Sequence, residues 1–246
     1  MGFPRRPARA VTAVLATGAL AALAGSVAPA RAPEETERAP AGFVALREVA
    51  PGIEQDIRYA GDHNFVGERI DGYEEPECLL AEESARALTR VERDLARDGL
   101  GLRVFDCYRP QRAVDHFLRW AEDPGATEER EEFYPRVPKD RLFDEGYLAE
   151  RSGHSRGGTV DLTLVDDEGR AVDMGTGFDF FDPASHPGSP EPDAEQRRAR
   201  ERLRSAMAAR GFTPIDTEWW HFTHDEEPFP DRHFDFPVER AALRGE

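Results

Sequence analysis

The stretch Thr159 to Asp166, TVDLTLVD, has the clearest structural pattern in the chain. Val160, Leu162 and Leu164 alternate with the more polar Thr159, Asp161 and Thr163. Side chains of a strand point alternately to its two faces, so this alternation predicts a strand with one apolar face. Asp161 is expected on the more polar face.

The sequence before and after this strand contains both helix-like and strand-like segments. The segment 79–99 has apolar residues at helical spacing and a glycine, Gly99, that predicts its C-terminal end. Irregular connections and the Gly157-Gly158 turn favour antiparallel neighbours. We therefore expect an α+β fold with a small central antiparallel sheet flanked by helices. The other predicted elements are strands at 100–110 and 218–222 and helices at 111–121 and 194–210.

Composition narrows the class of function. The 246 residues are 39% hydrophobic, enough for one large core. Lys and Arg total 32 against 49 Asp and Glu, which gives a net charge of -17. Such a charge repels phosphate backbones and anionic membrane surfaces, so no nucleic acid is expected as a partner.

The N-terminus has the pattern of an export signal. An arginine-rich start precedes an apolar, alanine-rich run from Val11 to Val27. We expect a signal peptide over residues 1–30, cleaved after Ala30, and therefore a secreted or cell-envelope protein. A retained membrane anchor is the alternative. Residues 31–40, RAPEETERAP, predict a disordered linker, which leaves 41–246 as the functional domain.

Cys78 and Cys107 are the two cysteines of the chain. An exported protein meets an oxidising environment, so a single disulfide is expected. The helix predicted between them can run back along the following strand and bring the two cysteines together. Two buried free thiols are the alternative.

Two motifs carry residues that suit a metal. Ser152 to Asp161, SGHSRGGTVD, contains His154 and Asp161, and EWWHF contains Glu218 and His221. Two imidazoles and a carboxylate suit a catalytic zinc site, in which a fourth position stays open for water. One objection is that residues three apart on a regular strand, such as Glu218 and His221, face opposite sides. Hydrogen-bonded structural histidines are the alternative.

Four ordered motifs resemble those of one enzyme family. FDCYRP, SGHSRGGTVDLTL, MGTGFDFFD and EWWHF are similar to the motifs of the VanX-type D-alanyl-D-alanine dipeptidases, and the similarity runs from about Tyr59 to Val238. The resemblance implies a zinc D,D-peptidase (hedgehog-like) fold and a chain that bends at the two tryptophans. It also implies His154, Asp161 and His221 as ligands of one Zn²⁺ per chain, Glu218 as catalytic base and Arg109 as the stabiliser of the transition state.

The resemblance also implies contacts to the substrate. Tyr59 and Asp179 are expected near the substrate ammonium and Ser152 near its carboxylate. Asp106 is counted with these substrate-binding residues and is expected to orient Arg109 from the same strand end. Asp179 could instead cap a turn, and Tyr59 could only pack. Of the remaining histidines His224 is the nearest rival ligand, and the others are expected to be structural or solvated.

The expected activity is hydrolysis of D-alanyl-D-alanine to two D-alanines in cell-wall turnover. A secreted zinc carboxypeptidase acting on wall peptides and a non-catalytic zinc-binding wall-recognition module are the alternatives. A dipeptidase needs a closed cavity, for which the segment Asp182 to Glu195 is a candidate lid. The oligomeric state stays open.

Overall fold

The strand predicted from TVDLTLVD is the central strand of a five-stranded sheet. It is β6, Thr159–Val165, and it lies in the order β3-β5-β6-β8-β7. Its antiparallel neighbours are β5, Gly101–Asp106, and β8, His221–His224. β7, Phe212–Pro214, pairs antiparallel with β8, whereas the short edge strand β3, Glu54–Gln55, pairs parallel with β5. The α+β class is confirmed, but the sheet is mixed and not purely antiparallel.

The computed structural model describes residues 1–2, 34–35 and 37–243. All elements named below belong to the unit that begins at Ala32. The predicted signal peptide, residues 1–30, lies almost entirely outside the described residues and stays a prediction. Within the predicted linker, β1, Glu34–Glu35, pairs parallel with β9, Phe234–Asp235, and the linker as a whole also stays a prediction.

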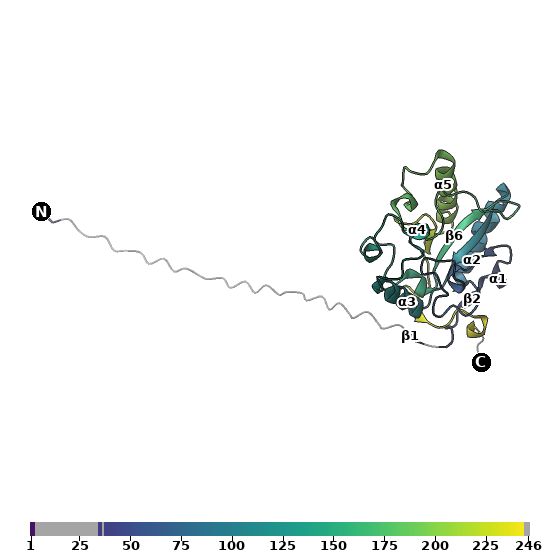
Figure 1. The fold of residues 1–246 in the computed structure, drawn as a ribbon, viewed down its shortest axis with the longest axis horizontal. Coiled ribbons are helices and arrows are strands. Elements are labelled where there is room, and N and C mark those ends of the chain that lie inside the picture. The colour runs from purple at the N-terminus through teal and green to yellow at the C-terminus, as the bar shows by residue number, and fades with distance from the viewer. Residues whose placement is uncertain (3–33, 36, 244–246) are drawn as a thin grey trace. The chain divides into compact units, whose positions relative to one another are not determined.

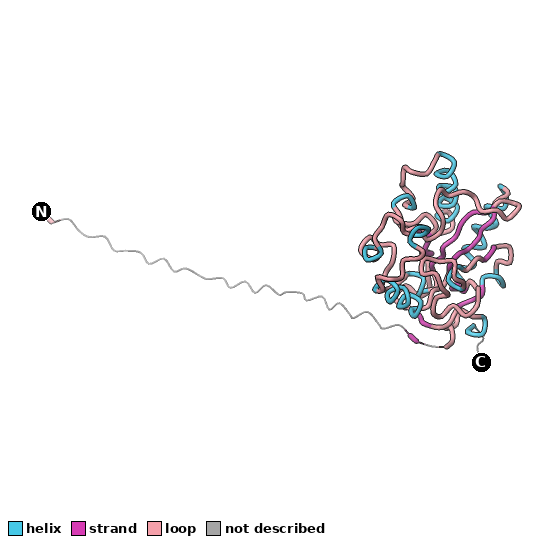
Figure 2. The backbone as a smooth tube through the Cα atoms, in the orientation of Figure 1, coloured by secondary structure: helices cyan, strands magenta, loops and turns pink. Residues whose placement is uncertain are grey.

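Two helices cover one face of the sheet. α2, Glu82–Leu95, and α5, Ala194–Ala208, contact each other, and they also contact β5 and β6 respectively (Figure 1). Ser84 of α2 lies 3.2 Å from Nδ1 of His224, on the face of β8 opposite to His221. The other face of the sheet is covered by α3, Gln111–Glu122, together with loops, which are drawn pink in Figure 2.

The helix predicted over 79–99 begins later than expected. Leu79–Ala81 forms β4, which pairs antiparallel with β2, Phe43–Ala45, and all three β4 residues are buried. An apolar run of three fits a buried strand as well as a helix, and tertiary pairing decides between them. The predicted stop is confirmed, because Gly99 takes the left-handed conformation with φ of 70°.

The other predicted elements differ from the structure by a few residues. The second helix is α3, Gln111–Glu122, and the last is α5, which ends at Ala208. The predicted strand 218–222 is wrong at its start, since β8 begins at His221. Further short elements are α1, Leu46–Val49, α4, Arg130–Phe133, and the 3-10 turns Arg58–Ala60, Ala96–Asp98, Lys139–Arg141, Gly153–Arg156, Pro183–Ser185 and Arg240–Leu243.

A disulfide joins Cys78 and Cys107, as predicted. Their Cα atoms are 5.3 Å apart, and both side chains are buried. The bond closes a loop with a sequence separation of 29 residues around α2. The loop-entropy estimate for such a loop is about 3–4 kcal/mol of stability.

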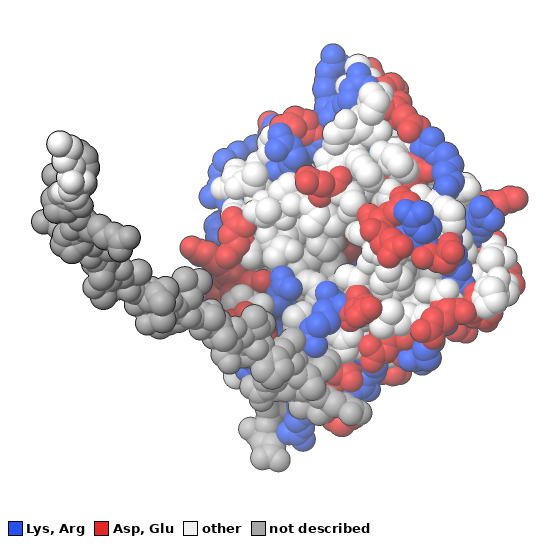
Figure 3. Space-filling model, turned by 90° about the vertical axis from the view of Figure 1, so that its left-hand side faces the viewer, with Lys and Arg blue, Asp and Glu red and all other residues white. Residues whose placement is uncertain are grey.

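Charges of both signs are interspersed on the face that Figure 3 draws. Exposed ion pairs among the described residues, such as Arg86 with Glu82 and Arg204 with Glu201, add little stability. Among the described residues, no helix has both the length and the apolar character needed to cross a bilayer.

Candidate active site

Three metal-ligand side chains converge on the face of the sheet opposite to α2. Nε2 of His154 lies 3.2 Å from Oδ2 of Asp161 and 3.3 Å from Nδ1 of His221. The same His221 nitrogen lies 3.1 Å from Oδ1 of Asp161. Among the described residues this is the one group of three or more His, Cys, Asp or Glu side chains with atoms close enough to share an ion.

Strand register places two of these side chains. Asp161 on β6 and His221 on β8 are direct partners in the antiparallel ladder. Thr159 and Thr223 point to the same face and are 2.9 Å apart through their hydroxyl oxygens. His224 alternates to the other face, where it lies against Ser84 and the Phe212 ring, so the rival ligand is excluded by strand parity.

The third ligand comes from a 3-10 turn. Gly153–Arg156 carries His154, and the Ser152 hydroxyl caps the turn by accepting from the His154 N–H at 3.2 Å. Gly157 ends the turn with φ of 79°, and a Cβ there would lie 2.4 Å from the Phe43 ring. A capped 3-10 turn therefore precedes β6, and the antiparallel neighbours expected beside the Gly157-Gly158 turn are β5 and β8.

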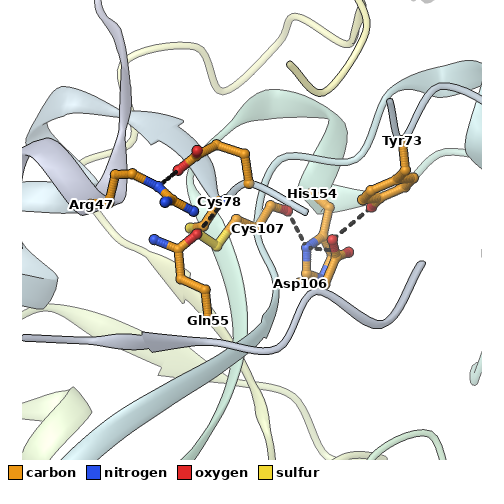
Figure 4. The surroundings of a disulfide bond; sticks show 8 residues. Arg47, Gln55, Tyr73, Cys78, Asp106, Cys107 and His154 are labelled. Carbon is orange, nitrogen blue, oxygen red and sulfur yellow. Dashed lines mark hydrogen bonds and ion pairs between the residues drawn. A yellow bond between two sulfur atoms is a disulfide. The ribbon is translucent and has the colours of Figure 1, made fainter. Parts of the chain in front are cut away.

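Two groups on the side of the His154 ring away from the other ligands fix its orientation. Its Nδ1 lies 2.7 Å from the carbonyl oxygen of Cys107 and 3.4 Å from Oδ2 of Asp106 (Figure 4). A carbonyl only accepts, so Nδ1 carries the proton in this hydrogen bond. The lone pair of Nε2 is then directed into the cluster, as metal-binding histidines require.

The cluster fits a tetrahedral ion. Ligand bonds of about 2.0–2.1 Å at tetrahedral angles separate ligand atoms by about 3.3–3.4 Å, close to the three distances found here. Oδ1 of Asp161 is buried, and Nδ1 of His221 lies 3.1 Å from it. Burial raises the pKa of Asp161, but charge and hydrogen-bond interactions with His154 and His221 outweigh burial and hold this pKa below its usual range.

Glu218 stands beside the cluster because the chain turns at Trp219-Trp220 before β8 begins. The strand objection therefore does not apply, and the bend expected at the tryptophans is confirmed. Oε2 of Glu218 lies 3.7 Å from Nδ1 of His221, and the side chain lines the same cavity. Burial raises the pKa of Glu218 well above its usual range, and the charges of Asp161 and Asp179 raise it further.

Arg109 contacts two carboxylates at the metal cluster. Its Nε donates to Oδ2 of Asp106 at 2.9 Å, and its guanidinium reaches to 3.5 Å from Oδ2 of Asp161. The guanidinium also lies over the rings of Tyr59 and Phe117, at 5.0 and 5.3 Å from their centroids. These contacts place a fixed positive charge at the edge of the metal cluster.

Comparison with known proteins now adds to this geometry. The family model for peptidase M15, described as D-ala-D-ala dipeptidase, matches residues 39–239. The chain belongs to the peptidase M15 family. It is 43% identical over 197 residues to a D-alanyl-D-alanine dipeptidase of Streptomyces coelicolor, a match that covers 80% of this chain and 98% of the relative. D-alanyl-D-alanine dipeptidases of Enterococcus faecium and Enterococcus faecalis are 40% and 41% identical, with the same coverage.

The metal site of this M15 peptidase is His154, Asp161 and His221. Around it the structure buries four carboxylates, Asp106, Asp161, Asp179 and Glu218, with one guanidinium, Arg109. Buried carboxylates are compensated by nearby cations or by protonation. A divalent ion at the three ligands would supply positive charge next to Asp161 and Glu218.

Tyr59 and Asp179 lie together at another wall of the M15 cavity. The Tyr59 hydroxyl donates to Oδ2 of Asp179 at 2.8 Å, and both side chains are buried. Asp179 has φ of 57°, a left-handed conformation that is rare for a residue with a side chain. Burial raises the pKa of Asp179 well above its usual range, with a further rise from the charge of Asp161. This carboxylate therefore suits a partner that carries a positive charge.

Asp106 and Ser152 have different surroundings. Ser152 lines the cavity, as expected for a substrate contact. Asp106 is fully buried behind Arg109, accepts from the Tyr73 hydroxyl at 2.6 Å, and does not line the cavity. The geometry agrees with the expected orienting role of Asp106 and gives it no direct contact with a ligand.

The cavity holds about 180 Å³ and has a wall that sequence analysis missed. Gly146, Tyr147, Leu148 and Ala149 line it, whereas Asp182 to Glu195, the expected lid, does not. That segment instead supports the wall from outside, because the Tyr147 hydroxyl lies 2.9 Å from Nε2 of His186. The wall lies in a loop with no periodic pattern, so local sequence carried no signal for it.

The remaining histidines lie apart from the metal site. Each has another neighbour among the described residues: His63 lies by Glu132, His116 by Glu68 and His233 by Arg151, at 2.7, 3.1 and 3.0 Å.

Proposed function

We propose that this M15 peptidase uses one Zn²⁺ per chain to hydrolyse D-alanyl-D-alanine to two D-alanines. The observation that carries the proposal is the His154, Asp161 and His221 cluster, which shares a small cavity with Glu218 and Arg109. Relatives that match at 40–43% identity over nearly their whole length are D-alanyl-D-alanine dipeptidases.

The charges of the cavity walls match the two ends of a free dipeptide. Asp179, supported by Tyr59, offers a buried carboxylate to the substrate ammonium. The Ser152 hydroxyl can donate a hydrogen bond to the substrate carboxylate. A dipeptide held in this way spans the cavity with its peptide carbonyl between the metal cluster and Arg109.

The chemistry divides among residues in distinct positions. When bound at the three ligands, zinc lowers the pKa of water and polarises a carbonyl. Glu218 accepts a proton from the attacking water as the carbon–oxygen bond forms. The Arg109 guanidinium stabilises the negative charge that develops on the carbonyl oxygen. Glu218 then delivers the proton to the leaving nitrogen as the carbon–nitrogen bond breaks, which releases two molecules of D-alanine.

The small size of the cavity and the aromatic packing next to Asp179 favour a dipeptidase over a carboxypeptidase. Pockets for drug-sized ligands hold about 300–1,000 Å³, so about 180 Å³ suits a much smaller molecule. Behind Asp179 the Phe178 ring is buried and stacked on Phe105, with 4.8 Å between centroids. A longer peptide would need an open groove at that position.

A non-catalytic wall-recognition module would keep the metal ligands without a base or an arginine. This chain has both Glu218 and Arg109 against the cluster, which argues for catalysis.

One assay tests the proposal against both alternatives. Purified protein is incubated with D-alanyl-D-alanine and with a wall pentapeptide that ends in D-alanyl-D-alanine, with and without a chelator. We expect chelator-sensitive release of D-alanine from the dipeptide alone. Comparable release from the pentapeptide would support the carboxypeptidase. Zinc-loaded protein that hydrolyses neither compound would support the binding module.

We further propose that the enzyme acts outside the membrane, on dipeptide freed by wall turnover. The predicted signal over residues 1–30 motivates this, and the Cys78–Cys107 disulfide supports it because such bonds persist in oxidising compartments. An exported enzyme cannot deplete a cytoplasmic dipeptide pool, so it should add nothing to glycopeptide resistance. Cell fractionation with N-terminal sequencing tests the export. An uncleaved cytoplasmic protein whose deletion lowers glycopeptide tolerance would reverse this proposal.

A further inference from the structure

The disulfide and the metal site share one residue. Cys107 forms the disulfide through its sulfur and accepts the hydrogen bond of His154 Nδ1 through its carbonyl oxygen (Figure 4). This hydrogen bond directs Nε2 of His154 at the other two ligands. The position of the Cys107 carbonyl therefore decides how well His154 is aligned.

Cys107 lies where regular structure stops. β5 ends at Asp106 and α3 begins at Gln111, so the intervening chain, 107–110, belongs to neither element. The backbone of this segment is tied at Tyr108, whose N–H donates to Leu79 at 2.9 Å, and at Arg109, whose N–H lies 3.4 Å from the His154 carbonyl. The segment thus reaches the metal site directly.

Cys78 holds the other end of the bond firmly. Its N–H donates to Oε1 of Gln55 at 2.9 Å, and its carbonyl accepts from the Leu46 N–H at 2.8 Å. Both cysteines are buried, Cys78 completely and Cys107 with 2% of its surface exposed. The disulfide therefore connects the support of a metal ligand to a fixed part of the core.

We propose that Cys107 is a positioning residue for His154, and that the disulfide raises the affinity of the site for zinc. The proposal rests on the proposed zinc function. Reduction of the bond takes two electrons and two protons from an external reductant and leaves two thiols. It removes the covalent constraint on Cys107, which loosens the hydrogen bond on which the His154 orientation depends. Full metal affinity is then reached only where the disulfide can form.

The size of the effect follows from comparable sites. Losing a residue that supports a metal-binding histidine typically lowers metal affinity about 10–100-fold. Reduction keeps the Cys107 carbonyl and only loosens its position, so we expect zinc affinity to fall about tenfold. Thermodynamic linkage is reciprocal: if the disulfide strengthens zinc binding, bound zinc must stabilise the oxidised cysteine pair by the same factor. For this two-electron couple a tenfold factor makes the reduction potential about 30 mV more negative.

The principal experiment compares three folded proteins. These are the wild type, the double variant Cys78→Ser with Cys107→Ser, and Leu203→Ala, which removes a buried side chain of α5 away from the site. Zinc affinity is measured by competition with a chromophoric chelator, and the geometry of the site by the visible spectrum of the Co²⁺ form. We expect about tenfold weaker zinc binding and an altered spectrum in the cysteine variant alone. Unchanged affinity and spectrum there, or equal losses in Leu203→Ala, would overturn the proposal.

A second measurement uses the wild-type protein and therefore does not depend on whether the cysteine variant folds. The zinc-loaded wild type is treated with a phosphine reductant while thiols, zinc transfer to the chelator and the near-ultraviolet circular dichroism are followed together. We expect zinc transfer to accompany thiol formation and to precede the loss of tertiary signal. Zinc retained until the protein unfolds would assign the disulfide to overall stability only. Both experiments read zinc and not turnover, so a zinc-loaded wild type without dipeptidase activity would count against the proposed function alone.

Discussion

Asp106 and Asp161 lie opposite each other on β5 and β6 because β5 contains a bulge. Leu102 and Val104 pair with Leu164 and Leu162, but the register then shifts by one residue before Asp106 pairs with Asp161. Simple alternation would keep Asp106 on the face of Leu102 and Val104. The bulge moves it to the face of the metal site, where it holds both Arg109 and His154.

The first prediction concerns the ligands. Separate replacement of His154, Asp161 and His221 by Ala should abolish stoichiometric zinc binding and activity, since two ligands hold the ion poorly. Metal analysis of each purified variant measures this. His224→Asn is the control, because His224 faces α2, and it should retain zinc. Stoichiometric zinc in all three Ala variants would remove the ligand assignment.

The second prediction separates base from ligand. Glu218→Gln should keep zinc and lose turnover by about 10²–10⁴-fold, because it removes proton transfer without removing a ligand. Zinc content and kcat are measured on the same preparation. A folded, zinc-loaded variant with normal kcat would show that another group transfers the proton.

The third prediction concerns Arg109. Arg109→Lys keeps a charge but loses the planar group that reaches both Asp106 and the cluster. We expect kcat to fall about 10²–10³-fold with a smaller change in KM, since the lost interaction belongs to the transition state. A rise in KM with kcat unchanged would instead make Arg109 a ground-state contact.

The fourth prediction tests the ammonium contact. Asp179→Asn removes the carboxylate that we propose to bind the substrate ammonium. It should raise KM for the dipeptide about 10–100-fold, which corresponds to the loss of a hydrogen bond to a charged group. Tyr59→Phe keeps the carboxylate and should have a smaller effect. Equal effects of the two variants on KM would mean that the pair only supports the cavity wall.

The fifth prediction is a pH dependence of stability at Glu92 on α2. Burial raises the pKa of Glu92 to about 7, and its Oε2 accepts no hydrogen bond in the described part of the chain. The folded state thus binds the proton more tightly than the unfolded state does. The stabilisation is complete below the ordinary pKa of 4.5 and is lost as pH rises towards 7.

Glu92→Gln should remove this dependence. We expect it to stabilise the protein at pH 8 by about 1–2 kcal/mol, a figure reduced for partial solvent screening, and to have little effect at pH 4.5. Denaturant unfolding at the two pH values measures the difference. The exposed Glu83→Gln on the same helix is the control and should change neither value. An equal effect of Glu92→Gln at both pH values would contradict the assignment.

The sequence alone determined the features that depend on the direction of side chains along a single strand. Alternation in TVDLTLVD was enough to place β6 and to separate Asp161 from Val160 and Leu162, because the side-chain direction on a strand repeats every two residues. The same rule could have excluded His224, three residues from His221. The roles of Glu218 and Arg109 came from the resemblance of motifs, not from any periodic pattern.

Tertiary structure alone decided which distant segments meet. The bulge before Asp106, the wall at Tyr147 and the contact between the Cys107 carbonyl and His154 each depend on segments that pack together from far apart in the chain. Such contacts depend on shape and burial over the whole core, which no short window of sequence contains. Local sequence therefore determined what each segment can offer to the site, and packing of the complete chain decided which of these groups share it.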